Sequence, residues 1–68
     1  TFEFDGKEYS QYEATQLQRK IETAVRASID RANMAAAYGD HQTIVTEQLR
    51  TYRLTQKYID LSDAAGLP

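Results

Sequence analysis

Hydrophobic and polar side chains alternate over residues 1–9, which is the pattern of β-strands. Two short runs, Phe-Glu-Phe and Lys-Glu-Tyr, flank Asp5-Gly6, a dipeptide that adopts the positive φ angles of a type I′ turn at little cost. A two-residue loop predicts three cross-strand pairs: Phe2 with Tyr9, Phe4 with Lys7, and Glu3 with Glu8. We expect a β-hairpin over residues 1–9 that packs on the rest of the chain, because a lone hairpin is marginally stable in water.

After this hairpin the apolar positions repeat with the period of an α-helix. Ser10 and Glu13 have the spacing of a capping box, and no Gly or Pro occurs from residue 11 to residue 38, so we expect a helix over residues 10–38. Small and apolar residues gather on one side: Ala14, Leu17, Ile21, Ala24, Val25, Ser28, Ala32 and Ala36. The opposite side carries a ladder of charges of alternating sign: Arg19, Glu22, Arg26 and Asp30.

A second helix follows a short bend. Gly39 suits the left-handed conformation after a helix, and Asp40 suits the N-cap of the next one. Because so short a connection makes two helices antiparallel neighbours, we expect a helical hairpin whose second helix covers residues 40–65. Gly66 is a stop signal, and Leu67 is placed to fold back on Leu61.

The second helix carries apolar stripes on two roughly opposite sides. One consists of Val45, Leu49, Tyr52 and Ile59, with Gln56 between them. The other consists of Leu54, Tyr58, Leu61 and Ala65, with Ile44 near its edge. One stripe meets the first helix, and the other needs cover from the N-terminal hairpin, a second copy or a parent domain. We expect Leu54, Tyr58 and Leu61 to be interaction residues.

Composition narrows the classes of function. Eight basic and ten acidic residues leave a net charge of −2, so the chain has no general attraction for nucleic acid or anionic lipid. There is no Cys and only one His, which excludes disulfides, thiolate metal sites and multi-His metal sites. No stretch approaches the length of a membrane span, and no signal peptide stands at the start. We expect one small domain without cofactor, metal or small-molecule substrate, and, since it begins with Thr1 and ends with Pro68, a fragment of a longer protein.

Several polar residues are candidates for a chemical site. His41 offers a base or a single ligand but has no second His or Cys to complete a site, so we expect an exposed residue. Asp60 and Asp63 could form an acid–base pair near Glu13, but the simpler interpretation is that they are solvated or capping residues. The second helix carries a basic stripe that either binds phosphates or forms ion pairs within the helix: Arg50, Arg53 and Lys57. The five Tyr residues fit either an interaction surface or internal packing.

A resemblance to a known family begins with these residues: Phe-Glu-Phe-Asp-Gly-Lys-Glu-Tyr-Ser over 2–10, Tyr-Glu-Ala-Thr-Gln-Leu-Gln-Arg over 12–19, Ile21-Glu22 and Arg26. The Gly39-Asp40 bend and the ending with Lys57-Tyr58 and Ala-Ala-Gly-Leu over 64–67 accompany it. Together these residues resemble the C-terminal region of the phage minor capsid protein 2 family. That family occurs in tailed phages and prophages of Gram-positive bacteria and is related in role to the Mu F-like minor head proteins.

The resemblance implies a virion component present in few copies, near the portal or inside the head, that acts in head assembly or DNA delivery. It implies no catalytic residues. It gives four residues of the first helix a role in docking onto another part of the virion protein or onto DNA: Tyr12, Arg19, Glu22 and Arg26.

We therefore expect a mainly α fold, an antiparallel two-helix hairpin preceded by a short β-hairpin. The expected function is that of a non-catalytic structural or interaction module of a phage or prophage minor capsid protein, whose partners are other virion proteins or a second copy. It would be located in the virion and, during assembly, in the cytoplasm of the bacterial host. Two alternatives stay open: a nucleic-acid contact module of the virion, and a free-standing dimeric helical regulatory protein.

Overall fold

The structure, a computed structural model, describes residues 1–67. Strands β1 (Phe2–Phe4) and β2 (Lys7–Tyr9) form a two-stranded antiparallel sheet. All three predicted cross-strand pairs are present. Asp5 and Gly6 have φ angles of 53° and 76°, both positive as a type I′ turn requires. The predicted hairpin is confirmed.

Helix α1 (Gln11–Ala37) begins at the predicted capping box. The Ser10 hydroxyl accepts from the Glu13 amide at 3.1 Å, and the Glu13 carboxylate accepts from the Ser10 amide at 3.0 Å. The hydrogen bond from the Ser10 backbone, followed by that of its side chain, holds the pKa of Glu13 below its ordinary value. Two of the amides left without a helical partner at this end of α1 are thereby satisfied.

Helix α2 (His41–Ala65) begins after the predicted bend. Gly39 has a φ of 70°, a left-handed conformation that glycine adopts without strain. The Asp40 side chain caps α2 by accepting from the Thr43 amide at 3.2 Å and from the Thr43 hydroxyl at 2.6 Å. Gly66, with a φ of 67°, closes α2 in the left-handed conformation expected of it.

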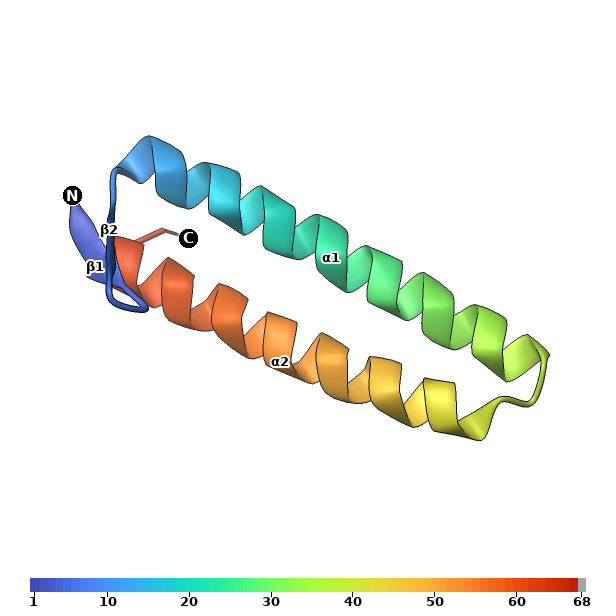
Figure 1. Cartoon of the computed structure of the whole chain (residues 1–68). Coiled ribbons are helices and arrows are strands. Elements are labelled where there is room, and N and C mark those ends of the chain that lie inside the picture. Colours follow the sequence, from blue (N-terminus) through green and yellow to red (C-terminus); the bar gives the residue numbers. More distant parts are fainter. Residues whose placement is uncertain (68) are drawn as a thin grey trace.

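The two helices lie antiparallel and in contact along their length, so that the molecule is a rod of 45 × 18 × 17 Å. Figure 1 shows the β-hairpin at the end of the rod where α1 begins and α2 ends, opposite the Gly39-Asp40 bend. This is the predicted fold class. Within residues 1–67, no helix is long and apolar enough to cross a membrane.

The seam between the helices follows a seven-residue repeat. Ala14, Ile21, Ser28 and Ala35 are the buried residues of α1, each seven positions after the last. The prediction that Ala36 lies on the same side of the helix as Ala14, Ile21 and Ser28 is wrong, because Ala36 is exposed. It assumed 3.6 residues per turn, whereas a strict repeat of seven shifts the buried row by about 20° per heptad from a straight helix.

The apolar core sits at the β-hairpin end of the rod. Its buried members come from β1 and both helices: Phe4, Ala14, Ile21, Leu61 and Ala65. Partly buried side chains surround them: Phe2, Tyr9, Leu17, Val25, Leu54, Tyr58 and Leu67. The β-hairpin thus has the packing partner that it needs, and Leu67 packs against the cluster that contains Leu61, as predicted.

Candidate interaction surface

The stripe formed by Leu54, Tyr58 and Leu61 faces α1, not an external partner. Leu61 is fully buried, and Leu54 and Tyr58 are partly buried against the same core. The prediction that these three side chains are interaction residues is therefore wrong. They form the intramolecular seam because this stripe, unlike the other, continues through Leu61 to Ala65 at the β-hairpin end of α2.

The opposite stripe of α2 is the surface left uncovered. We call it the outer face of α2, and it consists of Val45, Leu49, Tyr52 and Ile59. Their exposed fractions are 64%, 49%, 68% and 45%, although all four are large apolar or aromatic residues. Val45, Tyr52 and Ile59 are spaced by seven and Leu49 lies between them, so the stripe has the spacing of a helix-packing surface. Contiguous exposed apolar surface is typical of interaction sites in proteins generally.

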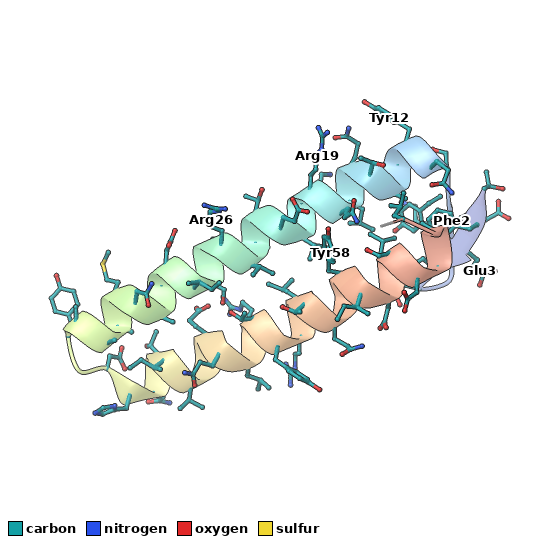
Figure 2. The ribbon with its side chains drawn as sticks, turned by 180° about the vertical axis from the view of Figure 1, so that it is seen from behind. Phe2, Glu3, Tyr12, Arg19, Arg26 and Tyr58 are labelled. Atoms are coloured by element: carbon teal, nitrogen blue, oxygen red, sulfur yellow. The ribbon has the colours of Figure 1, made fainter. Side chains whose placement is uncertain are left out.

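The outer face of α1 is polar. Tyr12, Arg19, Glu22 and Arg26 are all exposed, and Figure 2 shows Tyr12, Arg19 and Arg26 projecting from the same side of the helix. The predicted ladder of charges is present as a solvated surface, but its members form no ion pair with one another among the described residues. Exposed charges at this spacing contribute little to stability.

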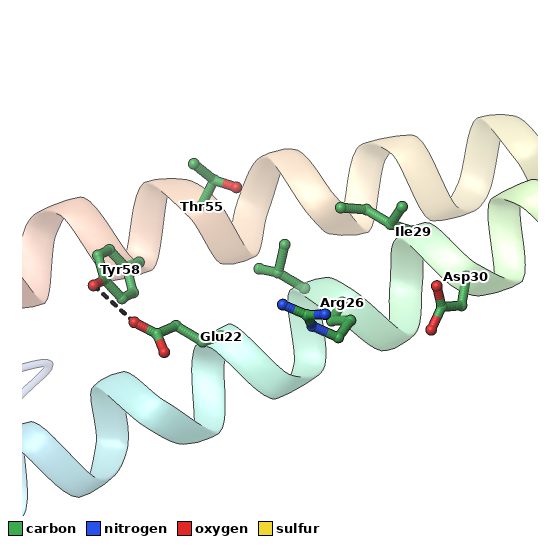
Figure 3. A pocket seen from close by; sticks show the side chains of 7 residues that line it. Glu22, Arg26, Ile29, Asp30, Thr55 and Tyr58 are labelled. Atoms are coloured by element: carbon green, nitrogen blue, oxygen red, sulfur yellow. Dashed lines mark hydrogen bonds between the residues drawn. The ribbon is translucent and has the colours of Figure 1, made fainter.

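Glu22 has a hydrogen-bond partner on α2. Its Oε1 accepts a hydrogen bond from the Tyr58 hydroxyl at 3.0 Å, and this bond raises the pKa of Tyr58. The pair stands beside a shallow groove of about 550 Å³ between the helices, shown in Figure 3. The lining is mixed apolar and charged: Glu22, Val25, Arg26, Ile29, Asp30, Thr55 and Tyr58.

A buried polar cluster crosses the seam between the core and the bend. Ser28 and Glu47 are both buried, and the Ser28 Oγ lies 2.6 Å from Glu47 Oε2 and 3.0 Å from the Glu47 carbonyl oxygen. The Thr51 hydroxyl donates to Ser28 Oγ at 3.1 Å. Arg31 Nε and Arg50 Nη1 donate to Glu47 Oε1 at 2.9 and 3.2 Å. The hydrogen bond from Arg31, followed by that from Ser28, lowers the pKa of Glu47.

Sequence reasoning missed this cluster. It counted Ser28 among the small and apolar residues of the first helix and assigned no buried role to Glu47. The signal was nonetheless present, because Glu47 stands seven residues before Leu54 and fourteen before Leu61, on the seam side of α2. Such a carboxylate needs charged and hydroxyl partners, and α1 provides Ser28 and Arg31 opposite it.

The basic stripe divides into one paired residue and two unpaired ones. Arg50 is held by Glu47, whereas Arg53 and Lys57 form no ion pair within residues 1–67. Together they line a small groove along α2 with neighbouring residues: Thr46, Leu49 and Leu54. The structure therefore does bring these three cations to one side of the helix, at the edge of its outer face.

The remaining candidate residues are solvated. His41 is exposed in the first turn of α2, and Asp60 and Asp63 are exposed near its end. Asp60 accepts from the Gln56 side chain at 3.2 Å. No group of three or more potential metal-ligating side chains occurs in the described part of the chain. The Tyr residues divide, since Tyr9 and Tyr58 join the core region while those at 12, 38 and 52 are exposed.

Comparisons of the chain with protein families, curated proteins and solved structures found no match.

Proposed function

We propose that this chain is a non-catalytic structural or interaction module of a phage or prophage minor head protein, acting in head assembly or DNA delivery. The resemblance of residues 2–26 and of the chain's ending to the minor capsid protein 2 family supports the virion setting. The observation that carries the interaction role is the outer face of α2, whose four large side chains are 45% to 68% exposed. The proposed locations are the virion and, during assembly, the host cytoplasm.

The rod supports such a role through a division between its two helices. The exposed large apolar residues of α1, Tyr12, Ile29 and Met34, form no stripe with helical spacing, whereas α2 is apolar on its seam side and again along its outer face. A helix with two apolar sides is stabilised when it lies between two neighbours. Burying the outer face gains about 25 cal/mol for each Å² of apolar surface removed from water. Partner binding in this proposal therefore uses α2, and α1 stays exposed.

Two matched tyrosine variants test this proposal in particles of the phage or prophage that encodes the chain. Tyr52 on α2 and Tyr12 on α1 are 68% and 73% exposed, so Tyr→Ser at either position removes a similar exposed ring. We expect Tyr52→Ser to lower incorporation of the protein into purified heads about tenfold, the effect of ~1.4 kcal/mol of interface energy. Tyr12→Ser should leave incorporation near the wild-type level. Quantitative mass spectrometry of purified heads measures both.

Two results would contradict the proposal. Absence of the wild-type protein from purified heads would remove the virion role. A loss caused by Tyr12→Ser but not by Tyr52→Ser would move the interface to α1.

A nucleic-acid contact role is the second candidate, and the groove lined by Arg50, Arg53 and Lys57 favours it. If the groove grips phosphates, the chain should retard duplex DNA at low salt and release it steeply as salt rises. Arg53→Ala and Lys57→Ala should each weaken binding and reduce the salt dependence by about one counterion. Lys20→Ala, on the exposed surface of α1, is the control. Absence of any gel retardation at low salt removes this candidate.

A further inference from the structure

The outer face of α2 has the spacing of one half of an antiparallel helix pair. Val45, Leu49, Tyr52, Gln56 and Ile59 are separated by four, three, four and three residues, which is the repeat by which two helices interlock. A face of this kind fits another helix of the same period. We propose, on the basis of the function proposed above, that the partner of this face is α2 of a second copy, packed antiparallel across a two-fold axis.

The surface area of the chain agrees with such a pair. Compact monomers of 7.8 kDa expose about 4,400 Å², whereas this rod exposes 4988 Å². The excess is about 600 Å² for each copy, so that a side-by-side pair would hide close to the ~1,200 Å² at which specific interfaces begin. The second copy thus removes the excess surface that the rod shape creates.

The uncharged edge of the face favours a second helix over a nucleic acid or a lipid surface. Gln48 and Thr55 border the face on the side away from the basic stripe, and both are exposed and neutral. When two such edges meet across a two-fold axis, each Gln48 lies beside the partner's Thr55, and no like charges are brought together. The side-chain amide of Gln48 and the hydroxyl of the partner's Thr55 can form hydrogen bonds there.

Charge also selects the register. With the two-fold axis midway between Leu49 and Tyr52, Leu49 of each copy packs on the partner's Tyr52, and Arg53 lies beside the partner's Thr46. A shift to the next heptad register brings Arg53 against the partner's Arg53 and Asp63 against the partner's Val45. Like-charge contact and a carboxylate on an apolar residue both cost free energy, so the first register is favoured.

Disulfide trapping tests the inference directly, because the chain has no cysteine of its own. Gln48→Cys and Thr55→Cys variants of the 68-residue chain are mixed in equal amounts and oxidised. We expect a linked species that joins one of each variant, identified by mass, in preference to either variant linked to itself. Thr23→Cys, exposed on α1, is the matched control and should not be linked.

Sedimentation equilibrium provides the second readout. The wild-type chain should show a concentration-dependent dimer, and Tyr52→Lys should weaken the dimer about tenfold or more, by placing a charge at the interface centre. Circular dichroism should show unchanged helix content, since Tyr52 contributes nothing to the core.

Three outcomes overturn the inference, and a fourth overturns only the function proposed above. A monomer at every concentration removes the second copy as the partner but leaves the head-incorporation test of the proposed function intact. Preferential linking of Thr55→Cys to itself indicates the other register, and linking through Thr23→Cys places the contact on α1. A dimer with the expected links in a protein absent from purified heads would instead overturn the virion role while this pairing stood.

Discussion

Leu61→Ala is expected to unfold most of the chain at room temperature. Leu61 is the largest side chain of the chain that is fully buried, and it belongs to the core that both helices share with the β-hairpin. Truncating a buried leucine costs about 2–5 kcal/mol. A single core in a chain this short supplies only about 3–5 kcal/mol of net stability. Thermal and urea unfolding followed by circular dichroism should show a transition shifted to much lower temperature and denaturant concentration, or no folded baseline.

Leu49→Ala is the matched control, because it makes the same change in the same helix on the outer face. Leu49 is 49% exposed, so its truncation should change the free energy of unfolding by about 0.5 kcal/mol or less in the monomer. The comparison must use dilute protein, where self-association does not contribute. Equal destabilisation by the two substitutions would mean that Leu61 does not hold the seam and that the arrangement of the two stripes is incorrect.

The parts of the fold that sequence predicts well depend on contacts between near neighbours. The Asp5-Gly6 turn fixes the strand register, the Ser10 and Glu13 pair starts α1, and Asp40 caps α2. Each of these interactions joins residues no more than a few positions apart, so the residue types themselves determine the geometry. For this reason the hairpin, both helices and the bend were all predicted to within about a residue.

The orientation of α2 depends on contacts that sequence periodicity does not reveal. Both of its stripes are apolar, and the helical pattern alone does not say which one meets α1. The deciding feature is the end of the helix. After Ile59, the next position of the outer stripe is the charged residue Asp63. The seam stripe instead ends with the buried residues Leu61 and Ala65, which share a core with Phe4. Only the seam stripe can therefore join a core shared with the β-hairpin.

The same reasoning explains why the interaction surface was assigned to the wrong side of α2. Side chains such as Leu54 and Leu61 have the composition of an interface whether the partner is another chain or the preceding helix. Burial separates the two cases, and burial is a property of the packed pair. Val45 and Tyr52, with exposed fractions of 64% and 68%, are recognised as a free surface only after α1 is in place.

Glu47→Gln is expected to lower the melting temperature at neutral pH by at least several degrees and to loosen the half of the rod nearest the bend. The apolar cluster ends near Val25 and Leu54, so the seam of the bend half consists of buried Ala35 and of the cluster of Glu47 with Ser28 and Arg31. The substitution keeps the shape of the side chain but removes the charge that Arg31 and Arg50 face. Buried polar groups that lose a partner destabilise far more than exposed ones. Hydrogen exchange of the α1 and α2 amides beside the bend measures the local effect.

The stabilisation that Glu47 provides depends on pH. Because the folded-state pKa of Glu47 is lowered by Arg31 and Ser28, the ionised carboxylate stabilises the fold above its ordinary pKa. That stabilisation is lost as the pH falls through the lowered value. The difference in melting temperature between wild type and Glu47→Gln should therefore be largest at neutral pH and shrink in acid. Glu13 and Asp40, whose pKa values are also lowered, are common to both proteins and cancel in the difference.

Glu22→Gln separates the effect of the buried carboxylate from the loss of any negative charge. Glu22 is exposed and accepts a hydrogen bond from Tyr58, which a glutamine carbonyl can also accept. We expect a change in melting temperature near zero, because the side chain is exposed and its hydrogen bond can be kept. If Glu22→Gln and Glu47→Gln change the melting temperature alike, the charge of Glu47 is solvated and does not stabilise the seam. If only Glu47→Gln shows the acid-sensitive loss, the packing of the bend half depends on one ionised side chain held between α1 and α2.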